Sequence, residues 1–382
     1  MEAHKDNVFT YLKWRGDLDF DAAGFNDIDA FICSQLSTPD YTGMISEDRS
    51  EAMITDVSAA YFKKNSDSVK KLGVLQSDSV LPMLKMLPEV RRFRETAFSY
   101  YINRFDHENA EQFCAVTLRL PDGSYCISFR GTDDTIIGWK EDFLLAVKER
   151  VQAQQDAVNY LNMVIRRIIF ENSRCMIYVC GHSKGGNLAV YASIYADPDV
   201  RSRISGVWNF DGPGLKKQVV LGSAYESMRS RIRSVMSKYA FVGTLFETPG
   251  TVVIVNGFVH GPVAHDGFTW ETEINGFANA PEGLTPVSRR FEQAMQETLD
   301  NMSYSEQEAF IEEFFAALSA TGAVTLTDLI TQKPKESLEV IKGLAGNRDI
   351  GRFGRIFAEA MLMPPQMFAA GSAAMTDKRN FN

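Results

Sequence analysis

The chain lacks the features that would assign it to a membrane, a nucleic acid or a metal ion. No stretch of its 382 residues approaches the roughly 18 consecutive apolar residues that span a membrane. Acidic residues outnumber basic ones by 49 to 40, and no dense Lys/Arg run offsets the net charge of −9. We therefore expect no transmembrane segment and no nucleic-acid partner. The five cysteines show no zinc-binding spacing, so no metal site is expected.

Neither a signal peptide nor a disulfide framework is expected. The first residues, Met1 to Asp6, are charged and lack the apolar core of a signal peptide. The cysteine count is odd, and four of the five (Cys114, Cys126, Cys175 and Cys180) lie in apolar runs of the kind that form strands. Reduced, buried thiols and a cytoplasmic location are the expectation.

What is present is an ordinary globular composition, 45% hydrophobic and 23% charged, with strands and helices in alternation. Residues 26–36, 50–64 and 90–101 have helical spacing, and a hairpin is expected over 112–130 around the turn 121–123. The expected elements that follow are a long amphipathic helix at 152–170 and strands at 175–180, 204–210, 232–236 and 251–255, with a further helix over 186–196. This alternation predicts the α/β class, with a mostly parallel central sheet and helices on both faces.

From about Pro286 onward the pattern becomes helix after helix. Helices are expected at 306–320, where Ser305 and Glu308 match a capping box, and then at 338–344 and 350–363. We therefore expect a domain over residues 1–285 and a helical C-terminal extension over 286–382. Its apolar helix faces must pack either on the main domain or against an acyl ligand, a partner or a membrane interface.

One short motif points to chemistry. Residues 181–185 read Gly-His-Ser-Lys-Gly and stand between the expected strand at 175–180 and the expected helix at 186–196. Strand, sharp turn and helix form the nucleophile elbow of α/β-hydrolases, in which Ser183 would present its hydroxyl from the turn. The side chain of His182 is expected to point away from Ser183. The alternative is a structural turn that contains a serine.

A serine hydroxyl needs a base within hydrogen-bond reach. In α/β-hydrolases the chain order is serine, acid, histidine, and only His260 and His265 follow Ser183 after a late strand. We favour His265 because Asp266 and the aromatic run 268–270 come after it and are suited to fix its loop.

The acid that would orient this base is expected to be Asp211. It ends the expected strand 204–210 and opens the turn Asp-Gly-Pro-Gly, at the carboxyl edge where catalytic groups of such sheets gather. The alternative is that Asp211 only accepts backbone hydrogen bonds in this turn. Glu247 and Asp266 are the other candidates.

Ester hydrolysis also needs donors for the developing oxyanion. The backbone N–H of Lys184 directly follows the nucleophile, and the loop after the hairpin offers Gly131 and Thr132. The N–H and the hydroxyl of Thr132 are both able to donate. A plain turn at the end of the strand is the alternative for this loop.

These motifs carry a family resemblance. Phe129-Arg130-Gly131-Thr132, then Trp139 with Asp142, and then Gly181 to Ala189 resemble the class 3 (fungal-type) lipases. The chain is most similar to an uncharacterised family of bacterial domains related to those enzymes, on the segments 11–17, 209–214 and 265–270. The resemblance implies an α/β-hydrolase fold, an oxyanion hole at Gly131-Thr132 supported by the Trp139–Asp142 element, and hydrolysis of esters.

The chain departs from this family in three places. Segment 239–243 has no acid where the lipases usually carry theirs, Asp133 and Asp134 put negative charge beside the expected oxyanion site, and Lys184 replaces an apolar residue. The sequence nevertheless predicts a serine esterase or lipase-like hydrolase, with Ser183, His265 and Asp211 as triad and no cofactor. Its expected partners are a small-molecule or lipid ester and, at most, a peripheral lipid surface. The alternative function is a catalytically inactive hydrolase fold used for binding or regulation.

Overall fold

The computed structural model describes residues 6–65, 77–106, 111–132, 135–148, 151–300, 302–325 and 328. The helices expected at 338–344 and 350–363 lie outside the described residues, and so do Asp133 and Asp134.

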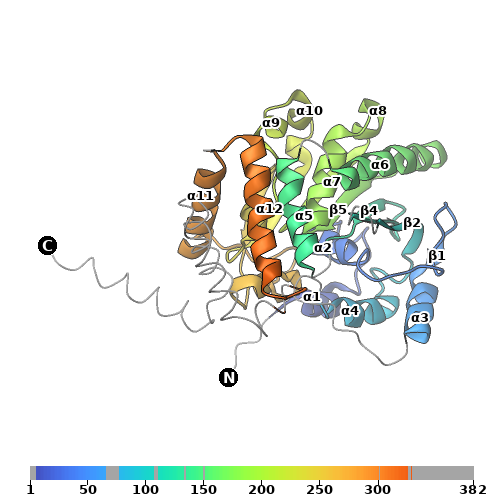
Figure 1. Ribbon diagram of the computed structural model, residues 1–382. Helices are drawn as coiled ribbons and strands as arrows, with labels where there is room; N and C mark the ends of the chain where they lie inside the picture. The colour runs from blue at the N-terminus through green and yellow to red at the C-terminus, as the bar shows by residue number, and fades with distance from the viewer. Residues whose placement is uncertain are drawn as a thin grey trace, which may run out of the picture.

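An eight-stranded sheet organises the described chain, with its strands side by side in sequence order (Figure 1). The first four strands pair antiparallel, and strands four to eight pair parallel. The expected hairpin is confirmed as the third and fourth strands, joined through Gly123 at φ 78°. The strands are β1 (Ala52–Met53), β2 (Ala97–Asp106), β3 (Glu111–Arg119), β4 (Tyr125–Phe129), β5 (Ile177–His182), β6 (Ile204–Phe210), β7 (Ile232–Ser237) and β8 (Thr251–Val255).

Helices connect and cover these strands. The α-helices are α1 (Val8–Arg15), α2 (Asp27–Gln35), α3 (Ile54–Lys64), α4 (Val80–Met86), α5 (Ile136–Val147), α6 (Gln152–Glu171), α7 (Lys184–Tyr195), α8 (Pro198–Arg201), α9 (Lys217–Val220), α10 (Ser223–Glu226), α11 (Pro286–Asp300) and α12 (Tyr304–Ala320). The 3-10 turns are η1 (Leu87–Glu89), η2 (Arg229–Arg231), η3 (Val242–Thr244), η4 (Gly261–His265) and η5 (Gly267–Thr269).

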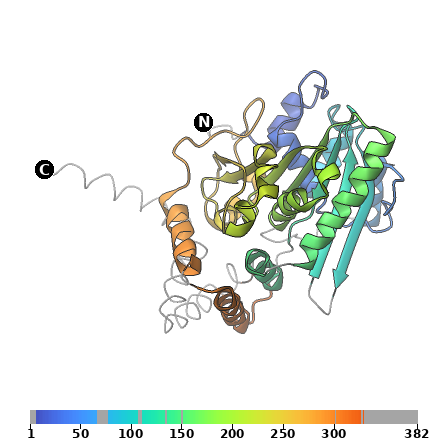
Figure 2. The ribbon, with the colours of Figure 1, turned by 90° about the horizontal axis from the view of Figure 1, so that it is seen from above.

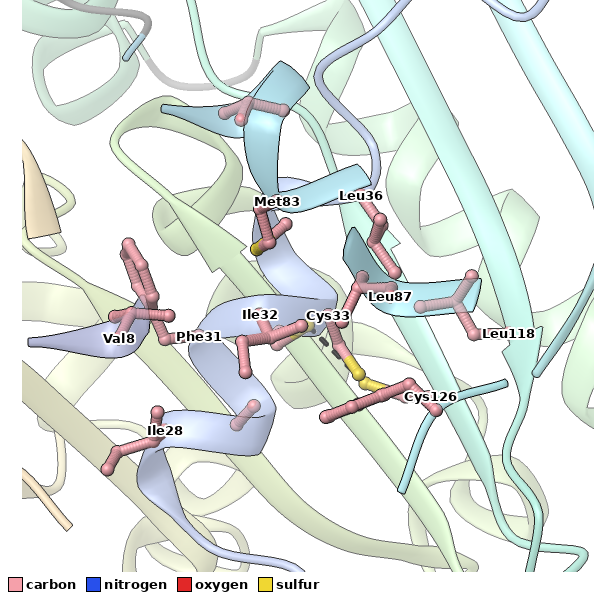
Figure 3. Packing of buried hydrophobic residues seen from close by; sticks show 14 of the residues in the cluster. Val8, Ile28, Phe31, Ile32, Cys33, Leu36, Met83, Leu87, Leu118 and Cys126 are labelled. Carbon is pink, nitrogen blue, oxygen red and sulfur yellow. Dashed lines mark hydrogen bonds between the residues drawn. The ribbon is translucent and has the colours of Figure 1, made fainter. Parts of the chain in front are cut away.

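Two apolar cores lie on the two faces of the sheet. Helices α6 and α7 pack on one face, and the N-terminal helices α1 to α4 cover the other (Figure 2). On the N-terminal side, Phe31 and Cys33 of α2 pack among buried residues from the strands and from α4, and the Cys33 thiol contacts Cys126 of β4 (Figure 3). The central strands β5 and β6 lie between these layers and are buried along almost their whole length, which explains why they read as nearly continuous apolar runs.

A third apolar cluster joins the C-terminal helices to the main body. Helix α12 lies along α5 (Figure 1), with the Phe315 ring 5.2 Å from Phe143 and 6.5 Å from Trp139. Helix α11 contributes Phe291, whose ring lies 5.4 Å from Phe241 beside η3. The first two helices after residue 285 therefore bury their apolar faces against elements of the preceding 285 residues.

Two local expectations were wrong. The segment expected as a helix at 90–101 enters β2 at Ala97, because its aromatic and β-branched residues favour a strand and β3 pairs with it on both sides of a bulge at Tyr100 and Tyr101. The capping box of α12 consists of Ser303 and Glu306 rather than Ser305 and Glu308, since Ser303 has the extended backbone of an N-cap.

The arrangement of strands, crossovers and covering helices is an α/β-hydrolase fold, which confirms the expected class. Within the described ranges, no helix has the length and apolar character needed to cross a membrane.

Candidate active site

The segment around Ser183 is a strand, a sharp turn and a helix. Ser183 stands between β5 and α7 with φ 57° and ψ −133°, a conformation that a non-glycine residue adopts only under strain. A Cβ atom at Gly181 would lie 2.1 Å from the backbone of Gly185, so the turn requires glycine there. The strained turn places Ser183 directly after the carboxyl end of β5.

The turn that carries Asp211 lies against this elbow. The Ser183 N–H donates to the Phe210 carbonyl over 3.0 Å, and a Cβ atom at Gly212 would lie 2.3 Å from the Ser183 carbonyl oxygen. Asp211 itself has φ 47° and directly follows β6. The parallel strands β5 and β6 therefore bring Ser183 and Asp211 to the same sheet edge.

Buried amides hold the Asp211 turn in place. Asn209 Oδ1 accepts from the Gly212 N–H at 2.9 Å. Asn187 of α7 donates to the Gly214 carbonyl at 2.8 Å and accepts from Gln154 of α6 at 3.0 Å. The Asp211 turn is thus held by hydrogen bonds from α7, the helix that follows Ser183.

His265 lies against the Asp211 carboxyl. Its Nδ1 is 2.7 Å from Asp211 Oδ2, and both side chains are buried. The Gly243 N–H donates to the other carboxyl oxygen, Oδ1, at 3.0 Å. One carboxyl oxygen therefore orients the imidazole while a backbone amide fixes the other.

Two polar atoms at this site are buried and have no hydrogen-bond partner. They are Ser183 Oγ and His265 Nε2, in residues that are 1% and 4% exposed. Buried polar groups are normally satisfied, so an unpartnered hydroxyl and an unpartnered imidazole nitrogen at one site are evidence of function.

Burial sets the protonation of the pair. It raises the pKa of the Asp211 carboxyl to about 8 and lowers that of the His265 imidazole to about 4. The Gly243 N–H acts in the opposite direction, because a hydrogen bond to the carboxyl favours the carboxylate. Since Asp211 and His265 share a hydrogen bond, they titrate as a pair.

The expected oxyanion donors lie beside the elbow. A Cβ atom at Gly131 would lie 3.1 Å from Ser183 Cβ, and Thr132 next to it is buried. Lys184 begins α7, so its backbone N–H lies at the start of the helix, directly after Ser183. The Lys184 ammonium points elsewhere and donates to the Gln112 carbonyl at 3.2 Å.

The competing candidates lie elsewhere or have other partners. His260 is exposed, with its ring 4.2 Å from that of Tyr239. Asp266 accepts from the Phe268 N–H and the Ser77 hydroxyl.

Glu247, the other candidate for the acid, is half-buried in a segment whose backbone pairs with Leu215. It lines a cavity of about 340 Å³.

The aromatic run after His265 fixes its loop, as the sequence suggested. Trp270 Nε1 donates to the Ala264 carbonyl at 2.9 Å, and Phe268 packs against Phe31 of α2.

Sequence reasoning missed the part that His182 plays. Its buried ring bonds through Nε2 to the His265 carbonyl oxygen at 2.8 Å, a contact across 83 residues that no local pattern signals. Within the part of the chain that the structure describes, no group of three or more His, Cys, Asp or Glu side chains is suited to hold a metal ion.

The chain is similar to one protein family and to solved structures of lipases. The model of the Mbeg1-like family matches residues 87–316. Among solved structures, lipase II from Rhizopus niveus matches at 15% identity and a TM-score of 0.34, over 59% of this chain and 80% of the lipase. The lipase from Rhizopus microsporus var. chinensis matches at 15% identity and 0.30, over 57% and 81%. M37 lipase matches at 15% and 0.32, over 45% and 62%. No curated protein matches the sequence.

Proposed function

The chain belongs to the Mbeg1-like family, and from the side chains at its sheet edge we propose that it is a serine hydrolase of carboxylic esters. Ser183 Oγ attacks the ester carbonyl carbon, and His265 Nε2 takes the hydroxyl proton and passes it to the leaving alcohol. Asp211 orients His265 and stabilises its protonated form. Water then attacks the acyl-enzyme with the same proton path, which releases the acid and restores Ser183.

The observation that carries the proposal is the contact between Asp211 and His265. The 2.7 Å bond occupies Nδ1, so Nε2 is left as the proton acceptor, and it is buried without a partner like the Ser183 hydroxyl. A structural histidine in a core would use both nitrogens. The backbone N–H of Lys184 and the N–H or hydroxyl of Thr132 are the proposed donors to the oxyanion.

A cavity lined in part by Leu215, which follows the Asp211 turn in the chain, is the proposed place of the acyl group. It measures about 340 Å³, which is within the range of ligand sites. Its apolar lining consists of Leu215, Phe246, Met295 and Met302. Polar and charged residues make up the rest of the lining, among them Lys216, Glu247 and Gln307. Methionines adapt to varied apolar shapes, as binding of an acyl chain requires. The proposed substrate is therefore a small-molecule or lipid ester.

Covalent labelling tests this function. A fluorophosphonate probe should label the wild-type protein, and Ser183→Ala should not be labelled. Ser193→Ala is the matched control, because Ser193 is a buried serine on α7 whose hydroxyl bonds to the Ala189 carbonyl. A folded wild-type protein that resists the probe and hydrolyses no ester would instead favour the inactive binding protein.

The C-terminal helices are proposed as an extension, over 286–382, of a hydrolase domain over 1–285. The apolar contacts of α11 and α12 with α5 and η3 support a structural layer. Removing residues 286–382 should then give insoluble or unfolded protein. A soluble truncate with faster or broader ester hydrolysis would identify the extension as a cover over the site.

The proposed location is the cytoplasm. All five cysteines are free, and four of them are buried, which suits a reducing compartment. Cell fractionation with an antibody to the chain checks this proposal, and recovery from an oxidising compartment would contradict it.

A further inference from the structure

His182 is a buried titratable side chain at the site that the proposed mechanism does not use. It ends β5 and directly precedes the nucleophile. Its ring lies 4.5 Å from the His265 ring, and Phe31 of α2 packs edge-on against it at 6.3 Å. Its Nε2 lies 2.8 Å from the His265 carbonyl oxygen.

The chemistry of this bond fixes the proton on His182. A carbonyl oxygen only accepts, so Nε2 must carry the hydrogen. Burial, followed by the neighbouring His265, lowers the pKa of His182 to about 3. At neutral pH the ring is therefore uncharged, with its single proton on Nε2 and none on Nδ1.

The bond connects the turn that carries Ser183 with the loop that carries His265. In the proposed reaction these two segments must keep a fixed distance from each other. His182 is covalently next to the proposed nucleophile, and its partner is the backbone of the proposed base. The 3-10 turn η4 that carries His265 is held at the adjacent carbonyl by Trp270, so two consecutive carbonyls, those of Ala264 and His265, are anchored by buried ring N–H groups. The His182 bond connects this turn to the elbow.

We propose that His182 is a positioning residue, which sets the distance between the Ser183 hydroxyl and His265 Nε2 by holding the His265 backbone from the elbow. This role rests on the proposed function, since it requires Ser183 and His265 to react together. The contact itself does not depend on hydrolysis and is testable separately.

Two substitutions separate this role from simple packing. The amide nitrogen of His182→Gln is able to reach the place of Nε2 and donate to the same carbonyl, whereas His182→Leu fills the space without a donor. We expect His182→Gln to keep kcat within about tenfold of the wild type. His182→Leu should lose roughly 10²-fold in kcat with little change in KM, the usual cost of a 1 Å misplacement. Equal kcat values for the two variants, with both folded, would overturn the role.

A second measurement does not depend on activity. In a ¹⁵N-histidine-labelled sample, His182 should appear as the neutral Nε2–H tautomer from pH 5 to pH 8. The His265 Nδ1–H resonance should persist in His182→Gln and shift or broaden in His182→Leu. A His182 that is protonated, or that carries its proton on Nδ1, would overturn the inference. If the wild type shows the expected tautomer but resists the fluorophosphonate probe, the proposed hydrolase function fails while the contact stands.

Discussion

Replacing Asp211 with asparagine tests the proposed triad most sharply, because the structure dictates how the new amide must lie. In the wild type, Oδ1 accepts from the Gly243 N–H at 3.0 Å and Oδ2 faces His265 Nδ1 at 2.7 Å. In Asp211→Asn the amide oxygen should keep the bond to Gly243. The NH₂ group then faces His265 and donates to Nδ1, which forces the proton of the imidazole onto Nε2.

The size of the effect follows from this geometry. The Nε2–H tautomer is unable to take the proton of Ser183. Rotating the amide to restore the correct tautomer would set its NH₂ against the Gly243 N–H, and a buried donor left unsatisfied costs about 1–3 kcal/mol. We therefore expect kcat to fall by at least about 10²-fold and towards the roughly 10⁴-fold seen for the same change in a serine protease. Stability should not fall, because the variant keeps its shape and loses a carboxyl whose pKa burial raises to about 8.

The assay is the hydrolysis of a short-chain nitrophenyl ester, with urea unfolding as the check on the fold. Glu247→Gln and Asp266→Asn are the matched controls. The Asp266 carboxyl accepts from Phe268 and Ser77, and Glu247 lies in the segment that pairs with Leu215. Each should keep kcat within about tenfold of the wild type. If Asp211→Asn retains more than a tenth of the wild-type kcat, or if Glu247→Gln falls as far as Asp211→Asn is expected to, the assignment of the acid is wrong.

Four further outcomes are expected. His265→Ala should lower kcat/KM by at least about 10³-fold and the exposed His260→Ala by less than tenfold; the reverse ranking would show that the wrong histidine was chosen. The value of kcat/KM should rise with pH, with a midpoint between pH 4 and 8. Burial lowers the pKa of His265 to about 4 and raises that of Asp211 to about 8, and the pair must lose one proton to leave Nε2 free. A kcat/KM that falls as pH rises through this window would contradict the prediction. Phe315→Ala should cost about 3–5 kcal/mol in urea unfolding, against less than about 0.5 kcal/mol for Phe170→Ala, whose ring is 92% exposed; similar values would mean that α12 adds little to stability. Met302→Trp should fill part of the cavity and raise KM for long-chain esters but not for acetate esters, and an equal effect on both would remove the acyl chain from this cavity.

The amino-acid sequence by itself determined the parts of the protein that depend on neighbouring residues. The apolar run of β5, the glycines at 181 and 185 and the start of α7 form one local unit, so the strained turn at Ser183 was predictable from a short segment. The hairpin of β3 and β4 was readable for the same reason, since its turn and its alternation are local. Alternation of strands and helices then predicted the sheet, because parallel strands need crossovers.

Local preference also failed where pairing partners decide the outcome. Residues 97–101 have helical spacing, yet they belong to β2, which pairs with β3 on both sides of a bulge at Tyr100 and Tyr101. Two residue pairs near position 305 match a capping box, Ser303 with Glu306 and Ser305 with Glu308. The extended backbone of Ser303 makes the first pair the one that forms.

Tertiary structure alone decided which side chains meet. The carboxyl of Asp211 and the ring of His265 are 54 residues apart in the chain, and His182 reaches the His265 backbone across 83. Sequence order narrowed the histidines to two, and the aromatic run after His265 favoured that residue. The contact of His265 with Asp211 depends on how the loop after β8 packs against Trp270 and Phe268. Contacts of this kind depend on the packing of whole layers, because parallel strands carry distant loops to one edge of the sheet.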